Sequence, residues 1–175
     1  VGKSSNPVSV LLTGDSILTQ PTTADYGYST HGGYVGYKLH EDGVPYYGIS
    51  QIGDKAQLFN VAKNRLYRTG YMKYCTHAIC DYGINDIAGD RTLVQLQGDL
   101  QTLWNMYRNR GIKIYACTVT PNTSGSGTAP REVIRTQLND WIRTVPSPLS
   151  GVFDAADYAE TARNSGVWKT GYSSD

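Results

Sequence analysis

Short apolar runs alternate with longer amphipathic stretches along this chain, and that alternation constrains the fold more than any other feature. The runs read as strands, and they begin near Val8, Val44, His77, Ile112 and Val152. Between them, apolar residues recur three and four positions apart, which is typical of amphipathic helices. Strands that alternate with helices form a parallel sheet, because each helix returns the chain to the edge at which the next strand begins. The sequence therefore predicts an α/β protein.

The expected elements can be placed from these patterns. We expect strands at 8–12, 44–47, 77–82, 112–119 and 152–155, and helices at 33–41, 55–67, 92–109 and from 130 onward. Asp90 is the predicted N-cap of the helix at 92–109, and Gly111 is its predicted stop. The last helix has an apolar face and ends before two prolines; its expected buried residues are Ile134, Leu138, Trp141, Ile142 and Val145. Beyond residue 155 we expect irregular structure. Right-handed crossovers favour the strand order 2-1-3-4-5, a flavodoxin-like three-layer α/β/α sandwich.

Length and charge narrow the class of protein. A chain of 175 residues is most simply one domain, 1–175, with its own core. Its net charge is +1 and it has no basic stripe, so we expect neither a nucleic acid nor an anionic membrane as partner. No apolar stretch approaches transmembrane length. Charged residues make up only 18%, and the polarity comes from small polar residues and 14 tyrosines, which favours a secreted, virion-surface or cell-surface protein that faces sugars.

The three cysteines, Cys75, Cys80 and Cys117, cannot all pair with one another. Cys80 and Cys117 fall inside predicted strands, where a thiol behaves as a small buried apolar group. We interpret all three as free thiols. No cysteine or histidine spacing resembles a metal site, so no metal and no cofactor are expected. The chain opens at Val1 without a signal peptide, and we expect its N-terminus to have been processed or trimmed.

Two polar motifs follow predicted strands that neighbour each other in this sheet. Gly14-Asp15-Ser16 follows the first strand, and Gly83-Ile84-Asn85-Asp86 follows the third. The carboxyl ends of such strands meet at the topological switch point, where open α/β folds place their chemistry. A serine hydroxyl there can act as a nucleophile if a base removes its proton. Alternatively, Ser16 caps a turn, Asn85 is a turn residue and Asp86 caps the segment that follows it.

A family resemblance covers both motifs. Val10-Leu11-Leu12-Thr13-Gly14-Asp15-Ser16-Ile17 and Tyr82-Gly83-Ile84-Asn85-Asp86-Ile87 resemble the first and third signature blocks of the SGNH/GDSL hydrolase superfamily. Gly48-Ile49-Ser50-Gln51-Ile52-Gly53-Asp54 resembles its second block. Tyr172-Ser173-Ser174-Asp175 resembles the start of its last block, in which an aspartate is followed three residues later by a histidine. The sequence departs from the pattern at that histidine, because it ends at Asp175, and the domain is expected to lack its C-terminal end.

The resemblance implies a serine esterase and a role for each matching residue. Ser16 would be the nucleophile, and the oxyanion hole would use the backbone N–H groups of Ser16 and Gly53 together with the side-chain amide of Asn85. Gly48 competes with Gly53, and we favour Gly53 because it directly precedes a predicted helix. Asp175 would orient a histidine that we expect on a separate C-terminal polypeptide.

The internal histidines are weaker candidates for the base. His77 begins the third strand, at the opposite edge of the sheet from Ser16, while His31 and His40 lack a paired acid at recognisable spacing. A surface or locally bonded histidine is the better interpretation of all three.

The expected reaction is hydrolysis of a carboxylic ester through an acyl-enzyme, with small acyl (acetyl) groups on a carbohydrate as the substrate. The loops at 19–30 and 121–128 are expected to select it, with Tyr26, Tyr28 and Tyr82 as contacts. A non-catalytic carbohydrate-binding domain on the same fold is the alternative. A flavodoxin-like nucleotide or phosphate binder is disfavoured, because Asp15 would repel a phosphate and the loop has no glycine-rich cradle.

Overall fold

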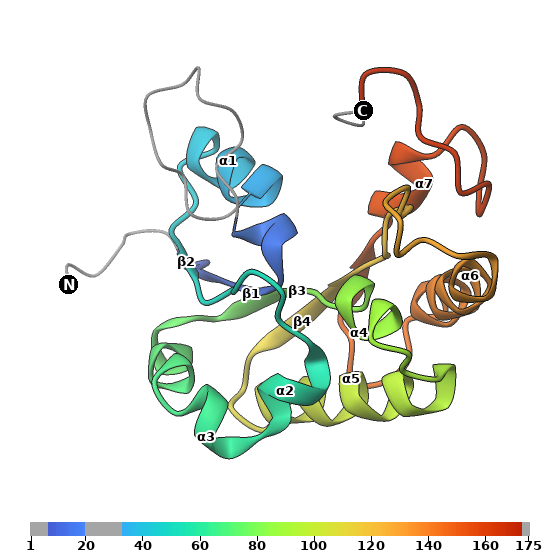
Figure 1. The fold of residues 1–175 in the computed structure, drawn as a ribbon. Helices are drawn as coiled ribbons and strands as arrows, with labels where there is room; N and C mark the ends of the chain where they lie inside the picture. Colours follow the sequence, from blue (N-terminus) through green and yellow to red (C-terminus); the bar gives the residue numbers. More distant parts are fainter. Residues whose placement is uncertain (1–6, 20–32, 173–175) are drawn as a thin grey trace.

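The computed structural model describes residues 7–19 and 33–172 of the chain. Its elements, in chain order, are β1 (Val10–Gly14), η1 (Ser16–Leu18), α1 (Gly33–Glu41), β2 (Tyr46–Gly48), α2 (Ala56–Asn60), α3 (Ala62–Arg65), η3 (Arg68–Tyr74), β3 (His77–Asp81), α4 (Ile84–Ala88), α5 (Leu93–Arg108), β4 (Lys113–Cys117), α6 (Ala129–Arg143), β5 (Gly151–Phe153) and α7 (Ala155–Ala159). Figure 1 shows them as a ribbon. Within this part of the chain, no helix has the length and apolarity needed to cross a bilayer.

The five strands form one parallel sheet in the order β2-β1-β3-β4-β5, which confirms the predicted α/β sandwich and its strand order. Successive side chains of a strand point to opposite faces of the sheet. Leu11, Ala78 and Ile114 therefore enter the larger core, and Leu12 and Ile79 enter the smaller one. Burial of both faces explains why each strand reads as an apolar run rather than an alternation.

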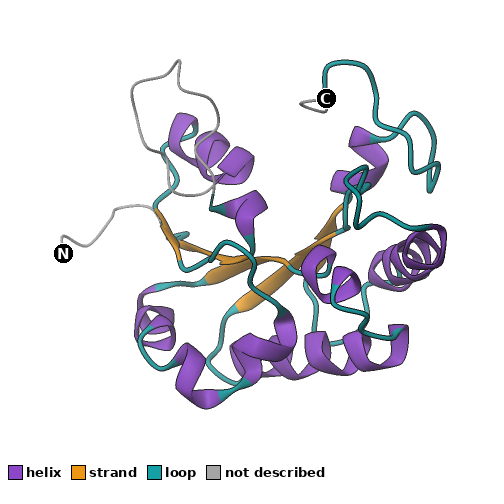
Figure 2. Ribbon diagram, viewed as in Figure 1, coloured by secondary structure: helices purple, strands orange, loops and turns teal. Residues whose placement is uncertain are grey.

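Helices cover the two faces unequally. The larger core packs against α2, α5 and α6 through Phe59, Leu100, Trp104, Leu138 and Ile142. The smaller core packs against α1 through the half-buried Val35 and Leu39. Figure 2 shows α1 on one side of the sheet, with α2 and α5 on the other. The face of the sheet that packs against α2, α5 and α6 therefore contributes most of the buried apolar side chains.

Several local predictions differ from the structure. The helix expected at 55–67 is interrupted at Val61, whose backbone is extended. The preceding Asn60 donates its side-chain amide to the Asp99 carbonyl of α5 at 2.8 Å. The cap of α5 is Thr92, in a capping box with Gln95, and not Asp90. Val145 is exposed and at φ 51°. It lies beyond α6 because the following Pro146 disfavours a helical residue before it. The irregular C-terminal region contains α7.

The cysteines are free, as predicted. Cys80 and Cys117 lie on neighbouring strands, but Cys80 belongs to the larger core and Cys117 to the smaller one. Their thiols therefore point to opposite faces of the sheet and cannot reach each other.

The backbones of β1 and β3 approach each other closely where the two strands end. Gly14 pairs with Asp81, and a Cβ added to Gly14 would lie 2.4 Å from the Asp81 carbonyl oxygen. Only glycine fits that position without moving a strand.

We therefore expect Gly14→Ala to lower the free energy of unfolding by about 1–3 kcal/mol, because the added methyl overpacks the junction. Gly98→Ala is the matched control, since Gly98 lies in α5 with open space around it. The control should gain about 0.5–1 kcal/mol from helix propensity. Urea unfolding of both variants measures the difference, and equal stability of the two would contradict the close approach.

Candidate active site

Ser16 lies on a single tight turn at the carboxyl end of β1. The Asp15 carboxylate accepts a hydrogen bond from the Ile17 N–H at 3.0 Å, and the Thr19 hydroxyl donates to the Asp15 carbonyl at 2.7 Å. These bonds hold the turn, so its cap is Asp15 and not Ser16. The Ser16 hydroxyl has no hydrogen-bond partner among residues 7–19 and 33–172, and the side chain is half-buried. It is therefore free to face a reacting group.

The segment after β2 extends the sheet towards Ser16. The Ile49 N–H donates to the Leu12 carbonyl at 2.8 Å, and the Gln51 N–H donates to the Gly14 carbonyl at 3.1 Å. Gly53 follows in an exposed turn at φ 74°, a left-handed conformation that suits glycine. Gly48, the competing candidate, is the last residue of β2 and pairs with Leu12. The Gly53 loop, residues 49–54, thus runs beside the end of β1.

Asn85 and Asp86 fasten that loop from the neighbouring strand. The Asn85 side-chain amide donates to the Asp54 carbonyl at 3.2 Å. The fully buried Asp86 carboxylate accepts from the Ala56 N–H at 3.2 Å and from the Gln57 N–H at 3.5 Å, at the start of α2. Asp86 therefore caps a helix 30 residues before it, and the expectation that it caps the following segment is wrong. Two adjacent side chains of α4 set the position of the Gly53 loop.

A buried polar network stabilises the Gly53 loop. The Asp54 carboxylate pairs with the Arg68 guanidinium at 2.6 Å and accepts from the Tyr82 hydroxyl at 2.9 Å. Arg68 also donates to the Ile49 carbonyl at 2.8 Å, so it ties both ends of the Gly53 loop. Tyr82 is buried, and its hydroxyl is taken up by this network, so its predicted role as a substrate contact is wrong.

Sequence reasoning missed Asp54 and Arg68. Asp54 had a usable signal, because it directly follows the favoured glycine. Arg68 had none, because its role depends on η3 folding back under the loop, which no local pattern indicates. Tyr26 and Tyr28 lie outside the described residues.

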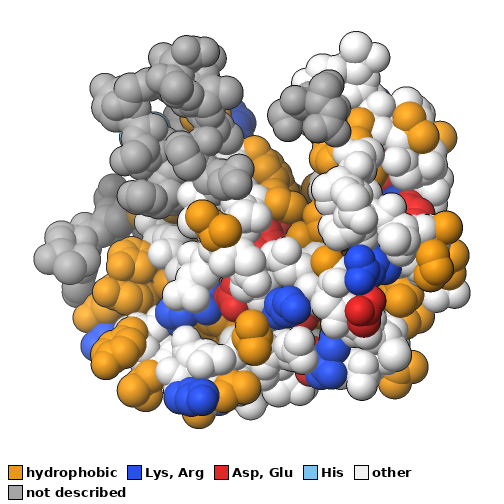
Figure 3. All heavy atoms as spheres, in the orientation of Figure 1, with side chains coloured by type: hydrophobic (Ala, Val, Ile, Leu, Met, Phe, Trp, Pro, Cys, Tyr) orange, Lys and Arg blue, Asp and Glu red, His pale blue; other side chains and the backbone are white. Residues whose placement is uncertain are grey.

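Buried carboxylates gather around the strand ends. Burial raises the pKa of Asp15 to about 7, with the charges of Asp86 and Asp54 adding to the effect and the Ile17 N–H opposing it. Burial also raises the pKa of Asp86 to about 6, against the two N–H groups that it accepts. The pKa of Asp81 is raised by burial and by Asp15. Figure 3 shows the surface hollowed between the α1 side and the α7 side, with apolar and acidic side chains at its base. No metal-binding group of three or more His, Cys, Asp or Glu side chains occurs within residues 7–19 and 33–172.

The histidines in the described ranges do not approach Ser16. His77 opens β3 at the amino end of the sheet, where its Nδ1 bonds the Thr76 hydroxyl at 2.8 Å, as expected from the sequence. His40 is exposed near the end of α1, which returns the chain to the same edge for β2. His31 and Asp175 lie outside the described residues. A base for Ser16 is thus not among the histidines that the structure describes.

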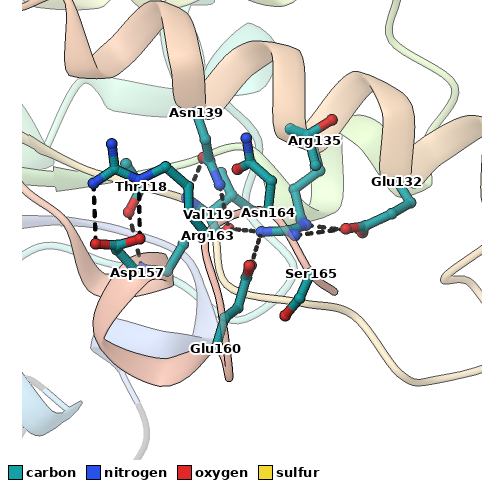
Figure 4. Close-up of polar contacts among 12 residues, drawn as sticks. Thr118, Val119, Glu132, Arg135, Asn139, Asp157, Glu160, Arg163, Asn164 and Ser165 are labelled. Atoms are coloured by element: carbon teal, nitrogen blue, oxygen red, sulfur yellow. Dashed lines mark hydrogen bonds and ion pairs between the residues drawn. The ribbon is translucent and has the colours of Figure 1, made fainter. Parts of the chain in front are cut away.

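The chain after β5 is clamped to α6, as Figure 4 shows. Glu160, fully buried at the end of α7, pairs with Arg135 at 2.6 Å, and Arg135 also pairs with Glu132 at 2.5 Å. Within the segment after β5 itself, Arg163 pairs with Asp157 at 3.0 Å. These contacts fix the segment that leads towards Asp175.

The segment that follows β4 is also bound to α6. The buried Asn139 side chain of α6 accepts from the Val119 N–H at 2.7 Å and donates to its carbonyl at 2.9 Å. Gly83 fits only because it lacks a Cβ, which would lie 2.6 Å from the Val119 side chain. A small pocket opens beside this contact between α4 and α6, and Ile84, Ile87, Ala88 and Val119 form its apolar wall.

Removing the cation beneath the Gly53 loop should be costly. We expect Arg68→Gln to lower the free energy of unfolding by about 3–5 kcal/mol, because Asp54 is left as a buried unpaired charge. Lys38→Gln, which breaks an exposed pair with Asp42, should cost under about 1 kcal/mol. Chemical denaturation of both variants checks this, and a small loss for Arg68→Gln would show that Asp54 is not held as a carboxylate by Arg68.

Asp15 should make stability depend on pH. Its folded-state pKa, about 7, lies above the value of about 3.9 for an unfolded aspartate, so folded protein keeps a proton that unfolded chain has lost. The free energy of unfolding therefore falls as pH rises from about 4 to about 7 and levels off above. Asp15→Asn keeps an acceptor for the Ile17 N–H but cannot ionise. The free energy of unfolding of the variant minus that of the wild type should therefore rise by about 2–4 kcal/mol between pH 4 and pH 8, so that the variant is the more stable protein at pH 8. Urea titrations at both pH values measure this; a constant difference would mean that Asp15 titrates normally.

The comparisons with known proteins agree with this architecture. The OSK domain family model matches residues 53–156. A search of curated proteins finds no sequence relative. Among solved structures, the chain resembles a protein of Desulfitobacterium hafniense assigned to the lipolytic G-D-S-L family, at 14% identity and a TM-score of 0.69, covering 94% of this chain and 85% of the other.

Two further structures share the fold. The lipase/acylhydrolase of Enterococcus faecalis matches at 16% identity and a TM-score of 0.61, covering 94% of this chain and 89% of the other. A catalytic mutant of an acetylxylan esterase from Geobacillus stearothermophilus matches at 17% identity and a TM-score of 0.62, covering 87% and 78%. The chain therefore has the SGNH/GDSL hydrolase fold and belongs to the OSK domain family.

Proposed function

We propose that the protein hydrolyses carboxylic esters through an acyl-enzyme on Ser16. The observation that carries this proposal is the way Asn85 and Asp86 fasten the Gly53 loop beside the turn of Ser16. That arrangement brings a hydroxyl, a glycine N–H and a side-chain amide to one edge of the sheet. An ester carbonyl needs a nucleophile and preorganised donors in such proximity, because its oxygen becomes negatively charged during attack.

In the proposed reaction, the Ser16 Oγ attacks the ester carbonyl while a histidine takes the hydroxyl proton. The Ser16 and Gly53 N–H groups and the Asn85 amide donate to the resulting oxyanion. The intermediate collapses, the proton passes to the alcohol that leaves, and the acyl group stays on Ser16. Water, activated by the same histidine, then releases the acid and restores the serine.

The histidine has to come from outside the described residues, since His40 and His77 lie at the other edge of the sheet. We propose that it belongs to a C-terminal polypeptide that follows Asp175, and that Asp175 orients it. The clamp between α6 and the segment after β5 supports this proposal, because it holds the chain that leads to Asp175 in a defined place.

For the substrate, we propose a small acyl group on a carbohydrate, which an extracellular or surface-exposed protein would encounter. The fold is shared with an acetylxylan esterase, and this likeness supports the choice of a carbohydrate ester.

The test is labelling with a fluorophosphonate, read by intact-mass spectrometry, with Ser16→Ala as the control. We expect one adduct that the control lacks, and a second polypeptide carrying the histidine in the active sample. Asn85→Ala should slow labelling by about 10²–10³-fold, because an oxyanion donor is lost.

An unlabelled protein in the presence of a histidine-bearing polypeptide would refute the acyl-enzyme proposal. That result, together with retained sugar affinity, would favour a non-catalytic carbohydrate-binding domain on the same fold.

A further inference from the structure

The surface of α3 and η3 carries cations without anions. No Asp or Glu occurs between Asp54 and Asp81 in the sequence. Within the part of the chain that the structure describes, Lys63, Arg65 and Lys73 form no ion pair, and Arg68 is turned inward to Asp54. On the opposite side of the molecule, arginines pair with acidic residues in and beside α7. The net charge of +1 thus hides a basic surface on one side.

The same surface exposes four tyrosines. Tyr67, Tyr71 and Tyr74 are 86%, 40% and 59% exposed, and Tyr47 of β2 is 43% exposed. The rings of Tyr47 and Tyr71 stack with centroids 4.0 Å apart and planes 17° apart. The Lys73 ammonium lies 4.9 Å from the Tyr74 ring centroid. Figure 3 shows hydrophobic and basic side chains gathered over η3 and α3, at the lower left.

The inward side of this segment already serves the core, so packing does not account for the tyrosines. A 3₁₀ helix repeats every three residues, and η3 buries Met72 and Arg68 while the rings of Tyr71 and Tyr74 remain exposed. An aromatic patch of this kind, rimmed by unpaired cations, marks an interaction site more often than a packing surface. We call Tyr47, Tyr67, Tyr71, Tyr74, Lys63, Arg65 and Lys73 the tyrosine platform.

We propose that the tyrosine platform binds an anionic polysaccharide, with sugar rings on the tyrosine faces and carboxylates on Lys63, Arg65 and Lys73. A tyrosine joins an apolar ring face to a hydroxyl tip, which matches a sugar with an apolar C–H face and a hydroxylated rim. The three unpaired cations complement a polymer that carries carboxylates.

This inference rests on the proposed function and narrows its substrate to the acyl esters of an acidic polysaccharide. The platform is built on β2, which precedes the Gly53 loop in sequence, and on α3 and η3, which follow it after α2. Arg68 joins η3 to that loop through Asp54 and Ile49. A polymer bound to the platform would therefore contact the same segment, η3, that supports the Gly53 loop of the candidate active site.

The experiment is affinity electrophoresis in native gels that contain polygalacturonate, neutral xylan or poly(U), with the Ser16→Ala protein as background. Each mobility is divided by that in a gel without polymer, so that changes in protein charge cancel. The test variants are Tyr67→Ala and the double variant Lys73→Ala with Tyr74→Ala. The control is Lys169→Ala with Tyr158→Ala, a second lysine–tyrosine pair, in which the tyrosine is exposed, the lysine is half-buried and the ammonium lies 5.6 Å from the ring centroid.

We expect retardation by polygalacturonate, with about a tenfold rise in the dissociation constant for each test variant and none for the control. Added salt should weaken the binding. No retardation, or equal losses in test and control variants, would overturn the proposal. Equal retardation by xylan would refute the claim that the platform prefers an anionic polysaccharide. Tighter binding of poly(U) through the same residues would assign the surface to nucleic acid instead. Because the Ser16→Ala background cannot form an acyl-enzyme, this outcome is independent of the fluorophosphonate result.

Discussion

The candidate active site depends on one buried carboxylate, that of Asp86. It accepts the first N–H groups of α2, which have no partner within their own helix, and thereby ties α4 to a segment 30 residues earlier. Asn85, one residue before it, bonds the Asp54 carbonyl. If this pair of contacts were lost, the Gly53 loop would keep its link to β1 but lose its position relative to α4. The placement of two proposed oxyanion donors, Gly53 and Asn85, follows from the same contacts.

Burial holds these carboxylates in defined positions, but it also lowers the free energy of unfolding. Asp15, Asp81 and Asp86 lie at the strand ends with pKa values raised by burial, so their charged forms oppose folding at neutral pH. Asp54 has Arg68 as a counter-ion, and Arg68 is anchored to the Ile49 carbonyl as well. Stability given up in this way is common where a fold holds polar groups for chemistry rather than for packing. The larger apolar core, which includes Ile49, Ala56 and Ile87 beside these groups, is what allows it.

Two segments at the surface of the molecule play different parts. The segment after β5 is held to α6 by ion pairs. Its buried Glu160 pairs with Arg135 of α6, which also binds Glu132 and the Val119 carbonyl. The segment between α2 and β3 is held instead by Arg68 and Met72, and it leaves tyrosines and lysines outside. One clamp therefore orders the approach to Asp175, and the other leaves a surface for the proposed polysaccharide.

Much of this protein was determined by the sequence itself. The strands, their parallel order and the buried face around Leu138 and Ile142 follow from periodicity and from the handedness of crossovers, which are local or topological rules. Ser16 and Asn85 could be nominated because short motifs follow predictable strands, and Gly53 because its segment resembles a signature block of the SGNH/GDSL superfamily. Only the tertiary structure decided what holds them. Asp86 and Arg68 act on backbone that is distant in sequence, Tyr82 is buried where a contact was expected, and α7 is too short for periodicity to reveal. Such contacts depend on how elements pack in space, and a pattern along the chain carries no information about partners that folding alone brings together.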